Sequence, residues 1–565
     1  MPLLLDTGQS SLVRRRDSEQ EACVIELPRS TAETDQLAIL ALGDGLPGRP
    51  DPERAAHAAV HALMTGWHAA PETWGPAKLL QECFAAANQS LLTADSHALA
   101  ASLSVLVLRS GRWLIGHAGD ARVWLYRNHQ IRLLTRDHRI PSFQPTPQFG
   151  KAVGLAPGLE ADVTTGELQE GDIFVLTSSG VHEALDSATI MSGVMGDVAA
   201  QQMADALTQR AQTSAKVGNL HACVVRVERL PAKIAAVASD EPATLAMISP
   251  PVIGDRVDGW RIEELVQKSS RFRLYRAAGG DGQHVLLKFP NPRFGDDAAY
   301  VDEFLREEWV ARRLENPHIA RALPLAKGQR SALYTVLAHV PGENLSDRIK
   351  RKRGLRTDEV LPLAKQLLEI LDLLRRAGVH HPDIRPKNLA LDKQNGQLVL
   401  LNAGASMLHH RREAENAQQT SSSALSYLAP ELLEGRDAGE RSDVYTAGAV
   451  LYRMLTGKYP YGKIKSLNHA AFGALDPTVC AKAGAPAWLG DILGRACAFD
   501  PQTRYANIAA FLRALTDAEK RTTAQAAAPA AAPPPTPTPS HKGREWIIVA
   551  ALGIGLLVYI LLALF

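Results

Sequence analysis

The sequence predicts a multidomain α+β protein with an α/β sandwich first, a second domain that changes from strands to helices, and one transmembrane helix at the end. Three observations support this fold class. Up to about residue 227, short apolar runs typical of strands alternate with amphipathic helical stretches. From residue 255, a β-rich stretch is followed by longer amphipathic helices. The final residues, 546–565, carry no charged side chain.

The first part of the chain contains several short runs of apolar and β-branched residues, which favour strands. A helical stretch at 53–64 lies between them. Runs this numerous, with helices interleaved, indicate an α/β sandwich. The runs expected to be strands are 37–43, 102–108, 112–119, 172–178 and 221–227.

The segment 231–254 lacks sustained periodicity and is rich in proline, so we expect a linker there. In the second domain, the stretch 360–374 has an apolar residue at every third or fourth position, which predicts an amphipathic helix. The face expected to be buried carries Leu361, Ala364, Leu368 and Leu371.

The chain ends in a predicted membrane span at 546–565. At a helical rise of about 1.5 Å per residue, this segment covers roughly 30 Å, the thickness of a bilayer's hydrocarbon core. Lys542 and Arg544 precede it, so the large N-terminal part is expected to stay on the cytoplasmic side. The Ala/Pro-rich stretch 524–540 predicts an extended tether before the span.

The overall charge is nearly balanced, with 62 basic against 60 acidic residues. A net charge of +2 supplies no global field to hold nucleic acid, so no nucleic-acid partner is expected. The five cysteines are scattered and show no CxxC spacing. This pattern disfavours a disulfide framework or a zinc site and fits a reducing compartment.

One set of motifs in the second domain resembles the Hanks-type Ser/Thr protein kinases. The stretch VHHPDIRPKNLAL at 379–391 is similar to their catalytic loop. The motif VLLK contains Lys288, and EEWVARRLENPHI contains Glu307. SYLAPE ends at Glu431, and DPQTRY supplies Arg504, the usual partner of that glutamate. The resemblance covers roughly 255–515 and implies a two-lobed kinase fold that uses ATP with Mg²⁺ or Mn²⁺.

The resemblance also implies roles for single residues. Lys288 would hold the α- and β-phosphates of ATP, with Glu307 paired to it. Asp383 would orient the substrate hydroxyl, and Asn388 would bind one Mg²⁺. Arg385 stands where the family has a catalytic lysine, which keeps the positive charge but not the geometry.

Other positions depart from the kinase pattern. The metal-binding aspartate is replaced by Asn402, a candidate cofactor ligand whose neutral amide binds Mg²⁺ less well than a carboxylate. The phosphate-covering loop at 266–276 has no glycine. Pro382 replaces the arginine of the HRD motif. The run at 420–423 lies where an activation loop is expected, either as a phosphorylation site or, more simply, as a plain loop.

Motifs in the first domain resemble PPM-type (type 2C) Ser/Thr phosphatases. They are found at 41–45, 116–127, 133–138 and 171–180. The resemblance implies an αββα sandwich in which carboxylates hold two Mn²⁺ or Mg²⁺ ions that activate a water.

By this resemblance, Asp44 would bridge the metals, and Gly45 would offer its carbonyl. Glu21 would occupy an outer position next to the site, and Asp120 would contact an accessory metal. Arg16 would bind the phosphate. These assignments supply the candidate phosphatase site.

Two of the family's metal ligands are missing, because Ser179 and Gly218 stand where carboxylates are expected. A dinuclear site without two anionic ligands loses much of its affinity. We therefore expect a phosphatase fold without turnover, and the metal requirement of this half stays doubtful.

Two functional hypotheses remain open. In the first, the chain is a membrane-anchored Ser/Thr protein kinase of weak or atypical activity, fused to a degenerate phosphatase-like domain, acting on protein substrates. In the second, it is a scaffold of two pseudoenzymes that binds nucleotide or phosphoproteins and regulates a partner. The fusion resembles bacterial regulatory proteins, which would place the anchor in the inner membrane. The expected divisions are a phosphatase-like domain at 1–230, a linker at 231–254, a kinase-like domain at 255–518, a tether at 519–545 and a membrane helix at 546–565.

Overall fold

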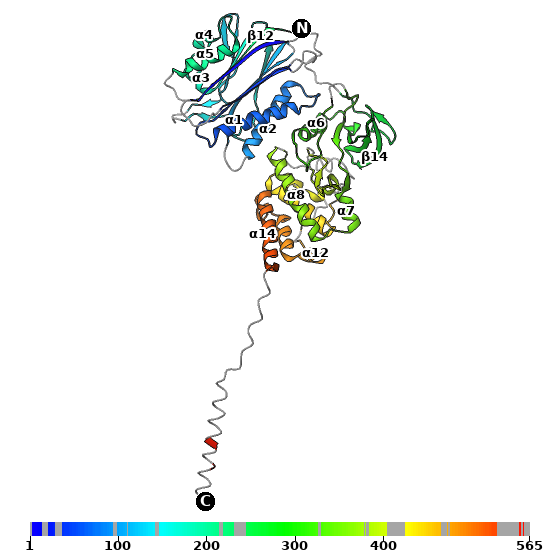
Figure 1. Cartoon of the computed structure of the whole chain (residues 1–565). Helices are drawn as coiled ribbons and strands as arrows, with labels where there is room; N and C mark the ends of the chain where they lie inside the picture. Colours follow the sequence, from blue (N-terminus) through cyan, green and yellow to red (C-terminus); the bar gives the residue numbers. More distant parts are fainter. Residues whose placement is uncertain are drawn as a thin grey trace. The chain divides into compact units, whose positions relative to one another are not determined.

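The computed structural model resolves into one compact unit, Met1–Phe511, and a second, Leu512–Phe565. The first unit contains the predicted phosphatase-like domain and the predicted kinase-like domain as far as Phe511 (Figure 1). The structure describes residues 3–13, 21–28, 37–93, 99–109, 111–141, 146–213, 219–230, 245–325, 329–377, 379, 383–403, 424–464, 472, 475–527, 553–554 and 558.

The N-terminal part contains two five-stranded antiparallel sheets. The first sheet has the order β1-β12-β11-β6-β7, and the second has the order β10-β5-β4-β3-β2. The strands of the first are β1 (Leu4–Leu12), β12 (Leu220–Arg229), β11 (Ile173–Thr177), β6 (Arg122–Arg127) and β7 (Gln130–Leu133). Those of the second are β10 (Asp162–Glu167), β5 (Arg112–Ala118), β4 (Ala101–Arg109), β3 (Leu37–Gly45) and β2 (Glu21–Glu26). All five runs predicted as strands are therefore confirmed as β3, β4, β5, β11 and β12.

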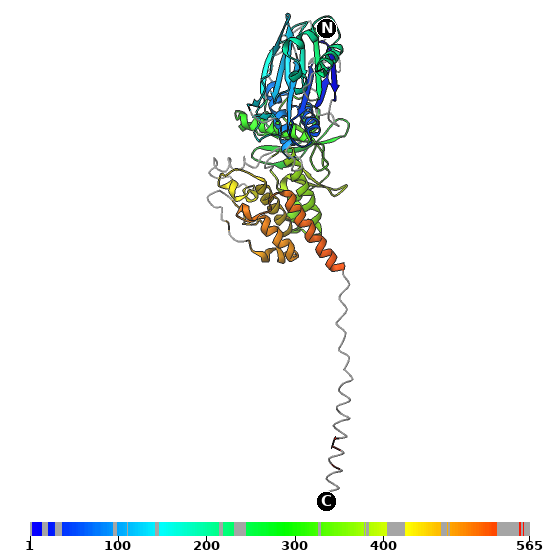
Figure 2. The ribbon, with the colours of Figure 1, turned by 90° about the vertical axis from the view of Figure 1, so that its left-hand side faces the viewer.

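The two sheets pack face to face because each strand points alternate apolar side chains at the other sheet. Leu106 and Leu42 from the second sheet share one core with Phe174 and Val225 from the first. A second core, between the first sheet and its helices, joins Val175 and Val224 to residues of α5. The resulting order, helices on both outer faces of a double sheet, is the predicted αββα sandwich (Figures 1 and 2).

The helices of this sandwich lie on opposite sides. Helices α1 (Pro52–His68) and α2 (Pro76–Thr93) pack on the second sheet, and the stretch predicted as helical, 53–64, lies within α1. Helices α3 (Ser179–Ala184), α4 (Ser187–Val194) and α5 (Ala200–Gln212) cover the first sheet. A short ribbon pairs β8 (Arg139–Ile140) with β9 (Gln148–Phe149).

The second domain begins with a five-stranded antiparallel sheet and one long helix, α6 (Ala298–Arg313). The strands, in sheet order, are β13 (Arg256–Val257), β14 (Trp260–Lys268), β15 (Phe272–Ala278), β16 (His284–Pro290) and β17 (Thr335–Ala338). The 3₁₀ turn η1 (Pro292–Phe294) links β16 to α6.

The remainder of the second domain is mainly helical, which agrees with the predicted change from strands to helices. Helix α8 contains the predicted stretch 360–374, and three of the four residues expected on its buried face are buried, whereas Leu361 is only partly covered. The helices are α7 (Leu345–Lys352), α8 (Thr357–Arg376), α10 (Pro430–Leu433), α11 (Glu440–Thr456), α12 (Pro477–Lys482), α13 (Ala487–Ala496) and α14 (Ile508–Ala527). A small sheet joins β18 (Gly342–Asn344), β19 (Leu389–Asp392) and β20 (Leu398–Leu400), and the 3₁₀ turns are η2 (Pro386–Asn388), η3 (Leu425–Tyr427) and η5 (Pro501–Thr503).

The predicted tether and membrane span lie mostly outside the described residues. Helix α14 continues to Ala527, so the first residues of the predicted tether 519–545 are helical and not extended as predicted, because alanine has the highest helix propensity. Of the predicted span 546–565, only Gly553, Ile554 and Val558 are described, and they are helical. Within the described part of the chain, no helix is both long and apolar enough to cross a bilayer.

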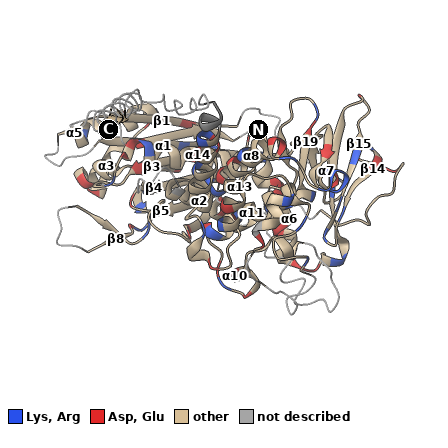
Figure 3. Ribbon diagram, turned by 90° about the horizontal axis from the view of Figure 1, so that it is seen from below, with Lys and Arg blue, Asp and Glu red and all other residues tan. Residues whose placement is uncertain are grey.

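Lys and Arg residues and Asp and Glu residues are both distributed along the described ribbon (Figure 3). Both signs occur in each domain, in agreement with the nearly balanced total.

Candidate functional site

The predicted kinase pair is assembled between a strand and a helix. Lys288 lies on β16, and its Nζ is 2.5 Å from Oε1 and 2.6 Å from Oε2 of Glu307 on α6. Both side chains are buried. Burial raises the pKa of Glu307 above its usual range, and the Lys288 ammonium opposes that shift. The lysine also lies over the ring of Phe272, with Nζ 4.2 Å from the ring centroid.

The predicted catalytic loop brings its three candidate residues together around η2. Arg385 Nη2 lies 2.8 Å from Oδ2 of Asp383, and both side chains are buried. Asn388 donates from Nδ2 to the main-chain oxygen of Asp383 at 2.7 Å. The loop is thus fixed by its own side chains, and Arg385 keeps a positive charge directly beside the carboxylate.

Two amides meet at the position where the resemblance implies a metal ion. Asn388 Oδ1 accepts from Gln267 Nε2 at 3.0 Å and from Asn402 Nδ2 at 3.3 Å. Asn402 is fully buried, and its Oδ1 has no hydrogen-bond donor among the described residues. A buried acceptor in this state suits a cation ligand. Asn402 would therefore offer its Oδ1 to a nucleotide-bound Mg²⁺.

Gln267 belongs to the loop that should cover the phosphates, and sequence reasoning did not single it out. The turn between β14 and β15 is closed by Ser269, whose Oγ accepts from the amides of Arg271 and Phe272 at 3.2 and 3.0 Å. Arg271 then points to α6, where its Nη2 lies 2.7 Å from Oε2 of Glu303. Arg271, a cation of the glycine-free loop, is thus paired with α6.

The predicted structural pair of the kinase motifs is present. Arg504 donates from Nη1 and Nη2 to the two carboxylate oxygens of Glu431 at 2.7 and 2.8 Å. Its guanidinium also donates to three main-chain oxygens, so the buried charge is well satisfied. The run 420–423, Gly404 and Pro382 lie outside the described residues.

In the N-terminal domain, Asp44 lies at the end of β3 and is buried. Its Oδ2 accepts a hydrogen bond from the main-chain nitrogen of Ser179 at 2.8 Å, at the start of α3. Glu21 pairs with Asp44 across β2 and β3. Burial raises the pKa of Asp44 to about 8, and the charges of Glu21 and Asp120 add to the shift.

Asp120 is engaged by an arginine that the sequence analysis missed. Arg139 Nε donates to Asp120 Oδ2 at 2.7 Å, and Arg139 Nη2 lies 2.5 Å from Glu183 Oε1. The Arg139 guanidinium therefore neutralises both the Asp120 and the Glu183 carboxylates. The described residues contain no group of three or more His, Cys, Asp or Glu side chains able to hold a metal ion. With Ser179 in place of a carboxylate and Asp120 paired to Arg139, these residues do not fit the family's metal pair.

The other phosphatase candidates have different outcomes. Gly45 pairs with Ala101 in the sheet, and a Cβ at this position would lie 2.2 Å from the main-chain oxygen of Pro52, so packing alone requires glycine. At Gly180, a Cβ would lie 2.1 Å from the main-chain oxygen of Asn219, which explains this glycine equally well. Arg16 and Gly218 lie outside the described residues, so their roles stay predictions.

Comparison with known proteins agrees with the kinase geometry. Residues 274–514 match the protein kinase domain family. A probable serine/threonine-protein kinase, PknB of Bifidobacterium longum, is 29% identical over 242 residues, which cover 41% of this chain and 35% of that protein. Serine/threonine-protein kinase A of Synechocystis sp. is 31% identical over 221 residues, covering 36% of this chain and 41% of that protein. The chain carries a protein kinase domain, and it spans less than half the length of these relatives.

Solved structures similar to the chain include bacterial serine/threonine phosphatases. Stp1 from Staphylococcus aureus has a TM-score of 0.37 and 18% identity, with 40% of this chain and 98% of that chain covered. The S. agalactiae phosphatase has a TM-score of 0.35 and 18% identity, with 40% and 100% covered.

Proposed function

We propose that this chain is a signalling protein of reversible Ser/Thr phosphorylation whose second domain transfers the γ-phosphate of ATP to protein hydroxyl groups at a low rate. The observation that carries the proposal is the buried Lys288–Glu307 pair, with Nζ within 2.6 Å of both carboxylate oxygens. In a kinase domain this pair places an ammonium against the α- and β-phosphates.

Each remaining residue has a role in this proposal. Asp383 would accept a hydrogen bond from the substrate hydroxyl, and Arg385 would stabilise the charge beside it. Asn402 Oδ1, with Asn388 next to it, would hold Mg²⁺, which neutralises charge on the transferred phosphate when bound. The carboxylate that a kinase normally offers there is absent, so we expect slow turnover.

We propose that the phosphatase-like domain has no phosphatase turnover. Asp120 and Glu183 share Arg139, and Asp44 accepts from the Ser179 amide, so these carboxylates already have partners. No reaction step through a metal pair follows from this arrangement. The domain would serve as a binding or regulatory module.

A second candidate function is a nucleotide-binding scaffold without phosphotransfer. The observation that favours it is the hydrogen bond from Gln267 Nε2 to Asn388 Oδ1 at 3.0 Å, which occupies one of the two amide oxygens near the expected metal position. A nucleotide with its Mg²⁺ would have to displace this side chain. Binding without transfer would then be the outcome.

We further propose that residues 546–565 anchor the protein in a membrane, with the large domains on the cytoplasmic side. The uncharged sequence and the preceding Lys542 and Arg544 support this proposal. Expression of the full chain followed by carbonate extraction of membranes tests it. Recovery of the chain in the extracted supernatant would contradict it.

Radiolabelled ATP separates the two candidate functions. The full chain is incubated with labelled ATP, Mg²⁺ or Mn²⁺ and a general protein substrate, alongside Asp383→Ala and the matched control Asp347→Ala, an exposed carboxylate on α7. Transfer that is lost only in Asp383→Ala supports the kinase. Equal labelling in all three proteins, or none in any, leaves the scaffold function.

A further inference from the structure

Helix α6 contacts the N-terminal domain on the side opposite to its catalytic glutamate. Trp309 follows Glu307 by two residues, about 200° around the helix axis. The Trp309 indole is buried, and its Nε1 donates to the main-chain oxygen of Gly66 on α1 at 2.7 Å. Its ring centroid lies 5.4 Å from that of Trp74. The helix is thus covered from behind by α1 and the loop after it.

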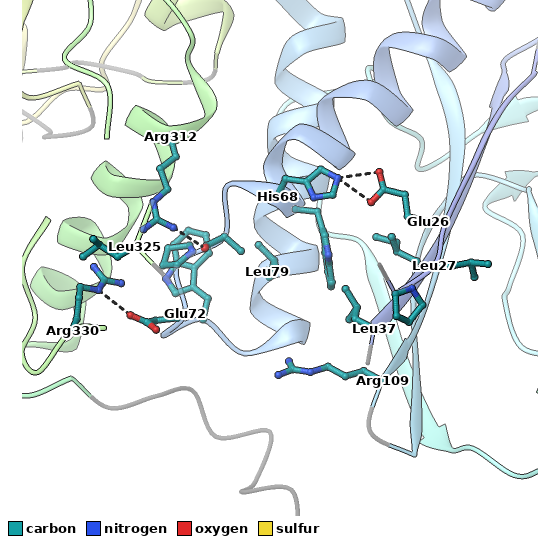
Figure 4. A pocket seen from close by; sticks show the side chains of 16 residues that line it. Glu26, Leu27, Leu37, His68, Glu72, Leu79, Arg109, Arg312, Leu325 and Arg330 are labelled. Carbon is teal, nitrogen blue, oxygen red and sulfur yellow. Dashed lines mark hydrogen bonds and ion pairs between the residues drawn. The ribbon is translucent and has the colours of Figure 1, made fainter. Parts of the chain in front are cut away.

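A buried charge network reinforces this contact (Figure 4). Arg330 donates from Nη1 to Glu308 on α6 and from Nε to Glu72 of the N-terminal domain, both at 2.9 Å. The side chains of Arg330 and Glu308 are each only 2% exposed. Arg312 adds a hydrogen bond from Nη1 to the main-chain oxygen of Ala70 at 3.3 Å. Glu72 is the member of this network that the N-terminal domain supplies, so the network links α6 to that domain through Arg330.

Nearer the start of α6, two ion pairs cross the same boundary. Lys78 pairs with Asp302, and Glu82 pairs with Arg306. Both N-terminal partners lie on α2. The helix is therefore held at positions before, beside and after Glu307.

We propose that the N-terminal domain is a built-in activator of the kinase domain that holds α6 in the position where Glu307 meets Lys288. This inference rests on the proposed nucleotide-binding function. Trp309, Glu308 and Arg330 act as positioning residues, because together they tie α6 to the other domain. A phosphatase-like domain without turnover would thereby have a regulatory role, the positioning of α6.

The test changes the N-terminal side of the contact in the full chain. In Gly66→Leu, the new side chain meets the Trp309 ring, because even a Cβ at this position would lie 3.1 Å from that ring, as well as 3.0 Å from Cys83 Sγ. Glu72→Gln removes the charge that faces Arg330 without changing volume, so it serves if the leucine variant misfolds. The matched control is Glu160→Gln, an exposed carboxylate in the same domain.

Two readouts distinguish this inference from the proposed function. Hydrogen exchange of peptides from 298–313 reports whether α6 is held, and titration with a fluorescent ADP analogue reports nucleotide affinity. We expect faster α6 exchange and about tenfold weaker nucleotide binding in both variants, with the control within about twofold of wild type. Unchanged exchange, or affinity that is unchanged or higher, overturns the inference. If wild type binds no nucleotide, the proposed function fails. The hydrogen-exchange comparison alone then shows whether the N-terminal domain holds α6 in position.

Discussion

Lys288 and Glu307 form a two-oxygen ion pair inside the kinase domain, with Nζ 2.5 and 2.6 Å from the carboxylate oxygens and both side chains buried. Such a pair has two separable effects. It removes an uncompensated charge from the interior, and it places an ammonium at the nucleotide site. Substitutions can separate the stabilising effect from the binding effect.

Lys288→Met is expected to destabilise the kinase domain by about 3–5 kcal/mol, since it leaves Glu307 buried without its counter-charge. The double variant Lys288→Met/Glu307→Leu is expected to recover most of that loss, because no charge remains buried. Neither variant should bind the fluorescent ADP analogue. Urea unfolding followed by tryptophan fluorescence measures the first effect. A cost below about 1 kcal/mol for Lys288→Met would show that Glu307 is neutral or has another partner.

Asn402→Asp is expected to raise Mg²⁺-dependent transfer by about tenfold or more, because it returns a carboxylate to the position of the unpaired Oδ1. Initial rates of labelled phosphate transfer at saturating ATP provide the measurement. The control is Asn395→Asp, an exposed turn residue of the same domain. A lower rate in Asn402→Asp than in wild type would count against metal binding at this position.

Arg139→Leu is expected to make the N-terminal domain sensitive to Mn²⁺. In wild type, the guanidinium neutralises Asp120 and Glu183, so millimolar Mn²⁺ should leave the melting midpoint unchanged. Without it, the two carboxylates repel each other, and a divalent cation that binds only the folded state raises the midpoint. Arg132→Leu, on the exposed side of β7, controls for loss of a charge. An equal Mn²⁺ response in wild type would refute the idea that Arg139 replaces the metal.

The stability of the folded chain is expected to depend on pH through Asp443, a buried residue on α11. Burial, with Glu440 nearby, raises the pKa of Asp443 from 3.8 to about 7. The folded chain therefore binds a proton that the unfolded chain releases between about pH 4 and pH 7, so this residue's contribution to stability falls as pH rises through that window. Asp443→Asn cannot titrate, so its melting midpoint relative to wild type should be higher at pH 8 than at pH 5 by at least about 2 °C.

The comparison between two pH values removes any constant cost of the asparagine. Asp437→Asn, an exposed residue in the loop before α11, should show the same difference from wild type at both values. The difference in melting midpoint between Asp443→Asn and wild type could instead stay constant or decrease with pH. That result would mean that the pKa of Asp443 in the folded chain lies near its ordinary value.

The strands at the centre of the sandwich could be predicted because their signal is local. Strand β4 is buried along nearly its whole length, and its continuous apolar run is visible in the sequence. Strand β10 was missed because it lies at a sheet edge with half its residues exposed, so its side chains are not selected to be apolar.

The candidate kinase residues could be predicted because each belongs to a short motif. The contacts that modify the site could not, because they join residues remote in sequence. Gln267 meets Asn388 across 121 positions, and Trp309 meets Gly66 across 243. Arg139 lies only 19 positions from Asp120, yet their meeting depends on how a ribbon folds back over the sheet. Such pairs are determined by packing, and no local spacing indicates them.

The contact between Trp309 and Gly66 has a consequence for expressing the two domains as separate chains. If the two domains were encoded separately, the kinase half would present a bare indole and the buried Glu308–Arg330 pair to water on the back of α6. The N-terminal half would likewise expose Trp74. Each half would then be prone to self-association. Fusion in one chain therefore keeps both apolar surfaces covered as soon as the protein has folded.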